Sequence, residues 1–176
     1  MIFRPTALAG LLVVEPELEP DERGFFARLH CPVEFAAAGI DFRPVQTSLS
    51  HNDRRHTLRG LHFQAPPRAE AKLVRAVRGR VFDVAVDLRP QSPTCHGWVG
   101  IELDAARGAA LFIPQGFAHG FLTLEPDTDL LYQISPGYLP GHDRGLRWDD
   151  PAIGICWPAT PAVISPRDAD YPDLGP

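Results

Sequence analysis

The sequence has no excess of basic residues and no long apolar run. Its 22 acidic residues outnumber its 17 lysines and arginines, which gives a formal net charge of -5 at pH 7. Nucleic-acid binding therefore has no electrostatic support, because proteins of that class present basic surfaces to phosphates. No apolar segment approaches the roughly 20 residues that a membrane-spanning helix needs. We therefore expect neither a nucleic acid nor a membrane as a partner.

Cysteine is scarce, and its spacing fits neither a zinc site nor a disulfide framework. Cys31, Cys95 and Cys156 are widely separated and odd in number, and no C-x-x-C pair is present. Reduced thiols in a cytosol are the simplest interpretation. The apolar run 7–14 is short and leads directly into Glu15, so we expect a first strand rather than a signal peptide. These features predict a cytoplasmic protein.

Proline and glycine, in contrast, are abundant and separate short apolar runs. The chain has 176 residues, with 19 prolines, 15 glycines, 44% hydrophobic and 22% charged residues. This length and composition fit one globular domain over 1–176, with a tail from about residue 158 that we expect to wrap the surface. Some ten short strands are predicted, with one short helix over 33–39. The economical fold class is all-β, a sandwich or barrel in jelly-roll order.

One predicted strand, residues 58–64, carries polar side chains among apolar ones. Its sequence is Leu-Arg-Gly-Leu-His-Phe-Gln, so the two-residue period of a strand puts His62 and Gln64 on one face and Arg59 on the other. A histidine that faces the inside of a sheet requires a partner or a function. A core histidine satisfied by a neighbour is the alternative interpretation.

The next two predicted strands, 72–77 and 81–88, are expected to pair as a hairpin. In the second of them, Asp83 and Asp87 fall on the face that we expect to be interior. Buried carboxylates require cations or hydrogen bonds, and Lys72 is a candidate partner for them in a structural ion pair.

A second informative stretch is Pro114-Gln-Gly-Phe-Ala-His119, a P-x-G-x-x-H turn between strands. It resembles the second motif of the cupin superfamily, a jelly-roll class. In metal-binding cupins this histidine joins an H-x-H pair and a glutamate, but here the pair is His62-Phe63-Gln64. An amide is a poor ligand for transition metals beside imidazole. His62, His119 and Glu70 remain possible ligands, and we expect no tightly held metal ion and no cofactor.

Further motifs, each weak alone, occur together and in order. They are Asp21-Glu-Arg-Gly-Phe-Phe26, Thr57-Leu-Arg-Gly-Leu-His-Phe-Gln64, Lys72-Leu-Val74, Phe82-Asp-Val-Ala-Val-Asp-Leu-Arg89, Ser92-Pro-Thr94, Ile113-Pro-Gln-Gly-Phe-Ala-His-Gly-Phe121, Tyr132, Tyr138 and Trp148-Asp-Asp-Pro151. Together they resemble the dTDP-4-dehydrorhamnose 3,5-epimerases, sugar-nucleotide epimerases of the cupin superfamily. The resemblance implies a cupin-type jelly-roll barrel with only minor short helices.

The resemblance also implies a set of catalytic residues. The family's substrate has a ketone at C4 of a hexose, which makes the hydrogens at C3 and C5 acidic. By resemblance His62 is the base and Tyr132 is the acid on the opposite face of the ring. Lys72 looks like the cation that stabilises the enolate at the C4 oxygen. Asp168 matches the carboxylate that orients the histidine.

A substrate-binding set follows from the same resemblance, and it departs from the family in places. The set comprises Arg23, Phe26, Arg28, Gln46, Ser48, Arg59, His119, Tyr138, Asp143 and Arg167. Arg28 stands where the family has glutamate, Ser48 where it has asparagine, and Asp143 where it has glutamate. At position 28 a guanidinium favours phosphate or a new carboxylate partner; a solvated strand residue is the alternative.

Strand parity raises one difficulty, because it separates Arg59 from His62 whereas the family uses both in one pocket. A bulge at Gly60 would bring them to the same side.

Three functions remain open at this stage. The first is an epimerase that inverts C3, C5 or both in a dTDP-4-keto-6-deoxyhexose, for rhamnose or a secondary-metabolite sugar. The second is the same fold acting on another nucleotide sugar or keto substrate. The third is a metal-binding cupin or a non-catalytic sugar-nucleotide binding protein. The resemblance further implies a homodimer in which residues of one subunit reach the site of the other.

Overall fold

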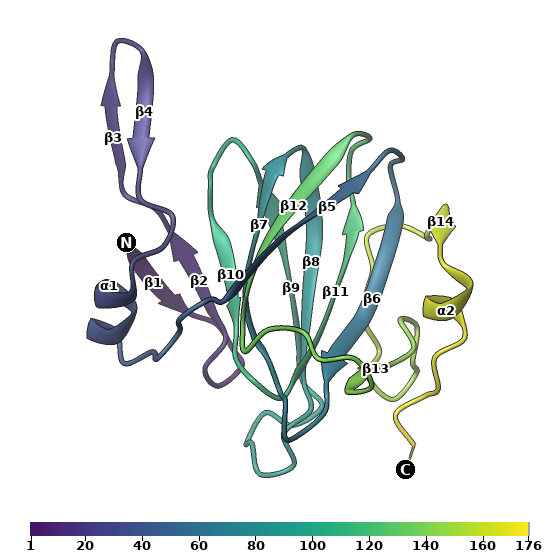
Figure 1. Cartoon of the computed structure of the whole chain (residues 1–176). Helices are drawn as coiled ribbons and strands as arrows, with labels where there is room; N and C mark the ends of the chain where they lie inside the picture. The colour runs from purple at the N-terminus through teal and green to yellow at the C-terminus, as the bar shows by residue number, and fades with distance from the viewer. Residues whose placement is uncertain (176) are drawn as a thin grey trace.

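Two antiparallel β-sheets pack face to face, as Figure 1 shows. The structure is a computed structural model that describes residues 1–175, and these form 14 strands and two short helices. The first sheet has the order β1 (Ile2–Pro5), β2 (Leu12–Glu15), β10 (Ala110–Ile113), β7 (Ala71–Arg78), β12 (Thr128–Ser135) and β5 (Gln46–Asn52). The second has the order β13 (Asp143–Gly145), β6 (Thr57–Gln64), β11 (Phe117–Thr123), β8 (Arg80–Asp87) and β9 (Trp98–Asp104), with β14 (Val163–Ile164) beside β6. Consecutive strands repeatedly change sheet, so the predicted all-β jelly-roll class is confirmed.

Apolar side chains of both sheets fill one side of the space between them. Val74 of β7 and Leu130 of β12 meet Ala85 of β8 and Phe121 of β11 in a single buried cluster. Members from one strand share one face of that strand, as Val74 and Ala76 of β7 do, because the pleat of a sheet puts alternate side chains on the same face. Within residues 1–175, neither β5 nor β6 adds a side chain to this cluster. The space between those two strands is therefore available for polar groups.

The expected hairpin of 72–77 with 81–88 is wrong. β7 pairs with β10 and β12 in the first sheet, whereas β8 pairs with β9 and β11 in the second. The chain crosses between the sheets at Gly79, whose φ of +70 lies in the left-handed region. A glycine between two apolar strands is as typical of such a crossing as of a hairpin, so local sequence does not separate the two.

Two further boundaries differ from the prediction near the ends of strands. The run 7–14 is not one strand, because β1 ends at Pro5 and β2 begins at Leu12, with a turn at Gly10 between them. The polar, charged stretch 51–56 has the composition of a loop, but β5 continues into it as far as Asn52.

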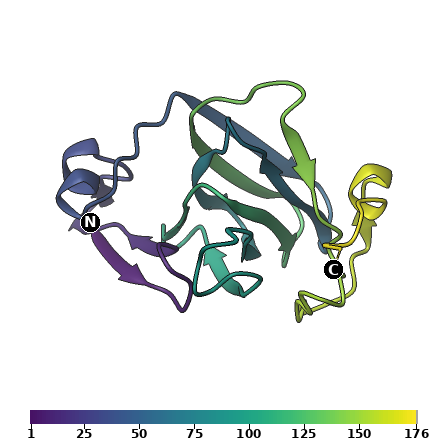
Figure 2. The ribbon, with the colours of Figure 1, turned by 90° about the horizontal axis from the view of Figure 1, so that it is seen from below.

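The N-terminal and C-terminal parts lie on opposite sides of the two sheets, as Figure 2 shows. The predicted helix is confirmed as α1 (Pro32–Ala37), which packs its one buried side chain, Phe35, against the first sheet. The hairpin of β3 (Leu18–Asp21) and β4 (Gly24–Ala27) stands clear of both sheets in Figure 1. After residue 158 the chain adds β14 and α2 (Pro166–Ala169) beside β6. No helix in the described part of the chain has the length and apolar character to cross a membrane.

Candidate active site

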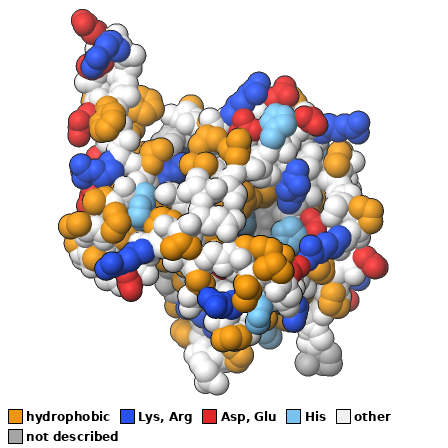
Figure 3. All heavy atoms as spheres, viewed as in Figure 1, with side chains coloured by type: hydrophobic (Ala, Val, Ile, Leu, Met, Phe, Trp, Pro, Cys, Tyr) orange, Lys and Arg blue, Asp and Glu red, His pale blue; other side chains and the backbone are white. Residues whose placement is uncertain are grey.

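A cavity of about 390 Å³ opens between β5 and β6, at the end of the sandwich that the apolar cluster leaves free. Figure 3 shows histidine side chains in this hollow of the surface. The first sheet contributes residues of β5, β7 and β12, and the second contributes β6, β11 and β13. The lining residues are Gln46, Ser48, Leu49, Ser50, Arg59, His62, Phe63, Gln64, Glu70, Lys72, His119, Tyr132, Ile134, Tyr138, Asp143, Arg144 and Arg167. Most of the predicted site residues are therefore together in one place.

Arg59 and His62 share this cavity because β6 contains the expected irregularity at Gly60. On β11, Phe121 and His119 are two residues apart, but they oppose Arg59 and His62, which are three apart on β6. The extra residue reverses the strand's parity, as a bulge does. Gly60 has a φ of +133, and a Cβ there would lie 2.6 Å from the Cα of Gly120. Only glycine fits this position, and it directs both side chains into the cavity.

His62 is held from behind by Asp168 of α2. The Asp168 Oδ1 atom lies 2.8 Å from the His62 Nε2 atom, and Asp168 Oδ2 accepts a 3.1 Å hydrogen bond from the Gly60 N–H. Ser165 caps α2 by accepting the Asp168 N–H at 3.0 Å. Burial opposes ionisation of Asp168, but the bonds from His62 and Gly60 outweigh it and hold the pKa of this carboxyl below its ordinary value. An ionised Asp168 fixes a proton on Nε2 and leaves Nδ1 as the basic nitrogen.

Tyr132 comes from the opposite wall, since β12 belongs to the first sheet and β6 to the second. Burial raises the pKa of Tyr132 well above its ordinary value, nearby Asp83 adds to the effect and Arg59 opposes it. The phenol therefore keeps its proton at neutral pH and is suited to donate it. Its ring packs edge-on against His119, with the centroids 5.8 Å apart.

Lys72 of β7 lies in the same cavity and is paired with Glu70. The Lys72 Nζ atom lies 2.9 Å from Glu70 Oε1 and donates to the His62 carbonyl oxygen at 3.3 Å. Only 8% of the Lys72 side chain and 9% of the Glu70 side chain are exposed, so this is a buried ion pair. An ammonium group at this depth is suited to stabilise negative charge on a bound ligand.

The expectation that Lys72 neutralises Asp83 and Asp87 is wrong. Asp83 lies 2.9 Å from the Nε2 atom of His119 instead. Asp87 accepts hydrogen bonds from Arg89 and from the hydroxyls of its neighbours, Ser92 and Thr94. Asp83 therefore finds its partner on β11 and Asp87 finds its partners in the loop after β8, while the buried Oδ2 atom of Asp83 has no hydrogen-bond partner among the described residues.

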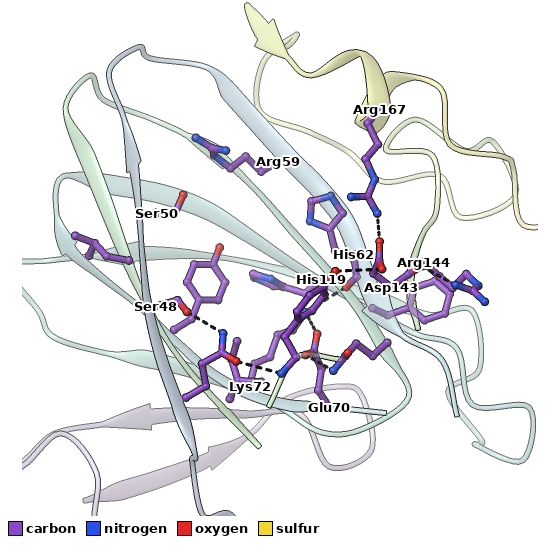
Figure 4. Close-up of a pocket in the computed structure, with 17 residues that line it drawn as sticks. Ser48, Ser50, Arg59, His62, Glu70, Lys72, His119, Asp143, Arg144 and Arg167 are labelled. Carbon is purple, nitrogen blue, oxygen red and sulfur yellow. Dashed lines mark hydrogen bonds and ion pairs between the residues drawn. The ribbon is translucent and has the colours of Figure 1, made fainter. Parts of the chain in front are cut away.

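A second group of polar residues lines the outer part of the cavity. Gln46 and Ser48 lie on β5, where the Gln46 Nε2 group donates to Ser48 Oγ at 3.1 Å. Tyr138, which is 52% exposed, donates its N–H to Gln46 Oε1 at 3.1 Å and its hydroxyl to Asp143 at 3.2 Å. Asp143 also pairs with Arg167. Figure 4 shows Ser48 on one side of the cavity and His62 on the other, with Arg59 and Arg167 above them in that view.

Three residues of the predicted substrate-binding set do not line this cavity. Arg23 and Phe26 belong to the projecting β3–β4 hairpin, where Arg23 pairs with Asp21 and Phe26 is 69% exposed. Arg28 follows β4 and donates to Glu34 at 2.8 Å. At this position the arginine has therefore gained a carboxylate partner within its own chain.

Two residues of the site were missed or misread from sequence. Asn52 is 2% exposed and accepts a 2.8 Å hydrogen bond from the Arg59 Nε group, which fixes the guanidinium at the cavity. The polar alternation of Gln46, Ser48, Ser50 and Asn52 is a signal that these side chains share one face of β5. Glu70 was considered only as a metal ligand.

The residues considered as metal ligands are engaged with other groups. His62 is bound to Asp168, His119 to Asp83 and Glu70 to Lys72. Among residues 1–175, no three His, Cys, Asp or Glu side chains are arranged to hold a metal ion. The donor set does not fit the metal site of a cupin.

Known proteins resemble this chain over nearly its full length. Residues 5–175 match the family model described as dTDP-4-dehydrorhamnose 3,5-epimerase. The enzyme of that name from Sinorhizobium fredii is 45% identical over 175 residues, which cover 99% of this chain and 90% of the relative.

Two solved structures have the same fold. The dTDP-4-dehydrorhamnose 3,5-epimerase of Bacillus anthracis, with TDP and PPi bound, superposes with a TM-score of 0.95 at 38% identity and covers 98% of this chain and 99% of that one. The Streptomyces bikiniensis 3'-monoepimerase ChmJ, in complex with dTDP-quinovose, has a TM-score of 0.90 at 34% identity, with 97% of this chain and 87% of that one covered.

Proposed function

The chain belongs to the dTDP-4-dehydrorhamnose 3,5-epimerase family and is an epimerase, and we propose that it inverts C3, C5 or both in a dTDP-4-keto-6-deoxyhexose. Its place is in the biosynthesis of a deoxysugar such as rhamnose. One observation carries the proposal. His62 and Tyr132 come from different sheets and line one cavity, and the ammonium group of Lys72 lies in the same cavity. Inversion requires a base and an acid on opposite faces of the ring, and this arrangement offers both.

The reaction begins when the Nδ1 atom of His62 removes a proton from the carbon next to the C4 ketone. Asp168 supports this step because it holds the N–H of the other ring nitrogen and stabilises the imidazolium that forms. The electron pair moves onto the C4 oxygen, where Lys72 stabilises the enolate. A positioned charge of this kind typically lowers the barrier by several kcal/mol.

Tyr132 completes the inversion by donating its proton to the opposite face of the same carbon. Its raised pKa keeps the phenol protonated before this step. Afterwards the phenolate takes a proton from solvent, and the imidazolium releases its proton to solvent. The net reaction therefore changes only the stereocentre. Protons from solvent therefore enter the product at every carbon that the enzyme inverts.

The outer part of the cavity binds the dTDP group in this proposal. Arg59 and Arg167 provide cations for the diphosphate. The half-exposed ring of Tyr138 offers a face to the thymine. Gln46, Ser48 and Asp143 provide hydrogen bonds at this end, and His119 lines the sugar position beside Tyr132.

The remaining predicted residues, Arg23, Phe26 and Arg28, act in the site of a second copy in this proposal. Their hairpin stands clear of its own sheets, and it exposes Phe25 and Phe26 by 58% and 69%. Figure 3 shows hydrophobic side chains along it. Apolar side chains in such a position support contact with another chain, and a homodimer would bring the hairpin to the partner's cavity.

The location of the enzyme is also part of the proposal. Cys31, Cys95 and Cys156 are all free thiols in the structure. Unpaired cysteines support a location in the reducing cytoplasm, where nucleotide sugars are substrates.

Proton NMR in deuterium oxide tests the function directly. The wild-type protein is incubated with dTDP-4-keto-6-deoxyglucose, and loss of the signals at C3 and C5 is followed together with the appearance of a new stereoisomer. We expect exchange and inversion at C3, C5 or both. If neither carbon exchanges, the proposed function is wrong for this substrate, and the UDP-linked sugar, run in parallel, shows whether another nucleotide is used.

A further inference from the structure

We propose that Glu70 is a positioning residue for Lys72, and that Gln64 connects this pair to the segment carrying Tyr138. The inference rests on the proposed function, in which Lys72 stabilises the enolate. Glu70 lies in the loop between β6 and β7, whereas Gln64 is the last residue of β6. Both line the cavity beside Lys72, as Figure 4 shows for Glu70 and Lys72.

Both carboxylate oxygens of Glu70 are used within the cavity wall. Oε1 lies 2.9 Å from the Lys72 ammonium in an ion pair, and Oε2 accepts a hydrogen bond from the Gln64 Nε2 group at 2.8 Å. Two partners on a buried carboxylate fix its rotamer, because any rotation would leave a buried charge without compensation. Glu70 therefore has one orientation available, and it presents a fixed acceptor to Lys72.

The position of the Lys72 ammonium follows from these contacts. A lysine has three N–H donors, and here one is directed to Glu70 and one to the His62 carbonyl oxygen. The third donor remains for the substrate. A lysine side chain has four rotatable bonds, so without Glu70 the ammonium would sample several positions. Glu70 thus confines the charge to the place where the C4 oxygen must develop its negative charge.

Gln64 extends the connection to the nucleotide end of the site. Its Oε1 atom accepts a 2.8 Å hydrogen bond from the N–H of Leu139, the residue after Tyr138. Two hydrogen bonds and one ion pair therefore connect the backbone beside Tyr138 through Gln64 and Glu70 to Lys72. Gln64 is only 4% exposed, and an amide can donate and accept at once. This double role gives a reason for glutamine where metal-binding cupins have histidine.

The geometry has two consequences for the kinetics. Loss of the Glu70 carboxylate should slow the chemical step without weakening the binding of the nucleotide, because Glu70 is bonded to Lys72 and Gln64, whereas Tyr138 is held by other groups. Loss of Gln64 should affect both the chemical step and the binding of the nucleotide, since Gln64 also holds the segment that contains Tyr138. A displacement of about 1 Å at a reacting group can cost on the order of 100-fold in rate.

The first test compares Glu70→Gln with wild type in kcat, in KM and in the Kd for dTDP measured by calorimetry. We expect kcat to fall at least about tenfold, while the Kd for dTDP stays within about twofold. Glu102→Gln is the matched control, because it removes the same charge from a half-exposed surface ion pair with Arg80. A kcat within about threefold of wild type in Glu70→Gln, or an equal loss of kcat and dTDP affinity, would overturn the proposal.

Two further variants keep the test decisive. If Glu70→Gln does not fold, Glu70→Asp is used, which retains the charge but withdraws it by one methylene. The kcat of Glu70→Asp must fall, while its Kd for dTDP stays close to the wild-type value. Gln64→Leu must lower kcat and weaken dTDP binding together; normal dTDP binding in this variant would contradict the connection to Tyr138. Wild-type exchange at C3 or C5 is measured in parallel, so failure of the proposed function is recognised separately from failure of this inference.

Discussion

The carboxylate of Asp168 lies 2.8 Å from the imidazole of His62, although 106 residues separate them in the sequence. The same carboxylate accepts the N–H of Gly60, which is the residue that reverses the parity of β6. One side chain of α2 therefore fixes the base and the backbone irregularity that directs the base into the cavity. This explains why a four-residue helix near the C-terminus matters for a site built from strands.

Asp168→Asn should reduce the rate of solvent exchange at the substrate's C3 and C5 by about 100-fold. The amide preserves the volume but no longer stabilises an imidazolium. Exchange rates from NMR measure the effect. Ser165→Ala is the control, because it removes the cap of α2 at a cost of about 1 kcal/mol and leaves the carboxylate in place. Equal exchange rates in the two variants would contradict the role given to Asp168.

The same carboxyl predicts a dependence of stability on pH. Its pKa in the folded protein lies below the ordinary value of 3.8, so around that pH the unfolded chain binds more protons than the folded one. Its contribution to stability is present above the unfolded pKa and is lost as the pH falls through the folded pKa. Urea unfolding should therefore show that the wild type has a higher free energy of unfolding than Asp168→Asn, and that this difference shrinks below about pH 4. If the difference in the free energy of unfolding grew on acidification, the pKa of Asp168 would be raised by folding and the prediction would be wrong.

Gly60→Ala should both destabilise the fold and abolish activity. The φ of +133 alone costs a non-glycine residue about 1–3 kcal/mol, and the added Cβ would meet the backbone of Gly120. Gly141→Ala is a matched control, because Gly141 has a φ of +88 but open space around it. Denaturant unfolding of the two variants isolates the steric part. An active Gly60→Ala enzyme would refute the bulge as the device that unites Arg59 and His62.

Phe26→Asp should weaken the proposed dimer, because it places a charge on a side chain that is 69% exposed on the β3–β4 hairpin. Sedimentation velocity at low micromolar concentration should show dimeric wild type and a shift of the variant toward monomer, with reduced activity. Ala152→Asp adds the same charge at an exposed position of the C-terminal part and should stay dimeric. A monomeric wild type that retains full activity would contradict the shared site.

Local sequence predicts the individual strands and turns of the site better than it predicts which strands pair. The sequence predicts a strand with polar side chains at 58–64 and a turn before His119, and β6 and the start of β11 confirm them, since alternation and turn residues act over a few positions. The pairing of β7 and β8 was predicted wrongly, because Gly79 looks the same in a hairpin and in a crossing between sheets. Long-range packing decides between them.

The partners of buried charges also differ from those that the residue pattern suggests. Asp83 contacts His119 and Lys72 contacts Glu70, whereas the pattern of residues suggested Lys72 for Asp83. The contact of Asp168 with His62 was expected only from resemblance to a family, since no spacing relates α2 to β6. Sequence reasoning about faces therefore succeeds along a regular strand, and it fails at the bulge in β6 and where the choice of a charge partner depends on which strands pair.

The most direct test of the account compares solvent deuterium uptake with inversion in His62→Ala and Tyr132→Phe. The variants are incubated with dTDP-4-keto-6-deoxyglucose in deuterium oxide and followed by NMR. We expect no uptake at C3 or C5 in His62→Ala, and residual uptake without productive inversion in Tyr132→Phe. Wild-type uptake in His62→Ala, or wild-type inversion in Tyr132→Phe, would contradict a base and an acid on opposite walls of one cavity.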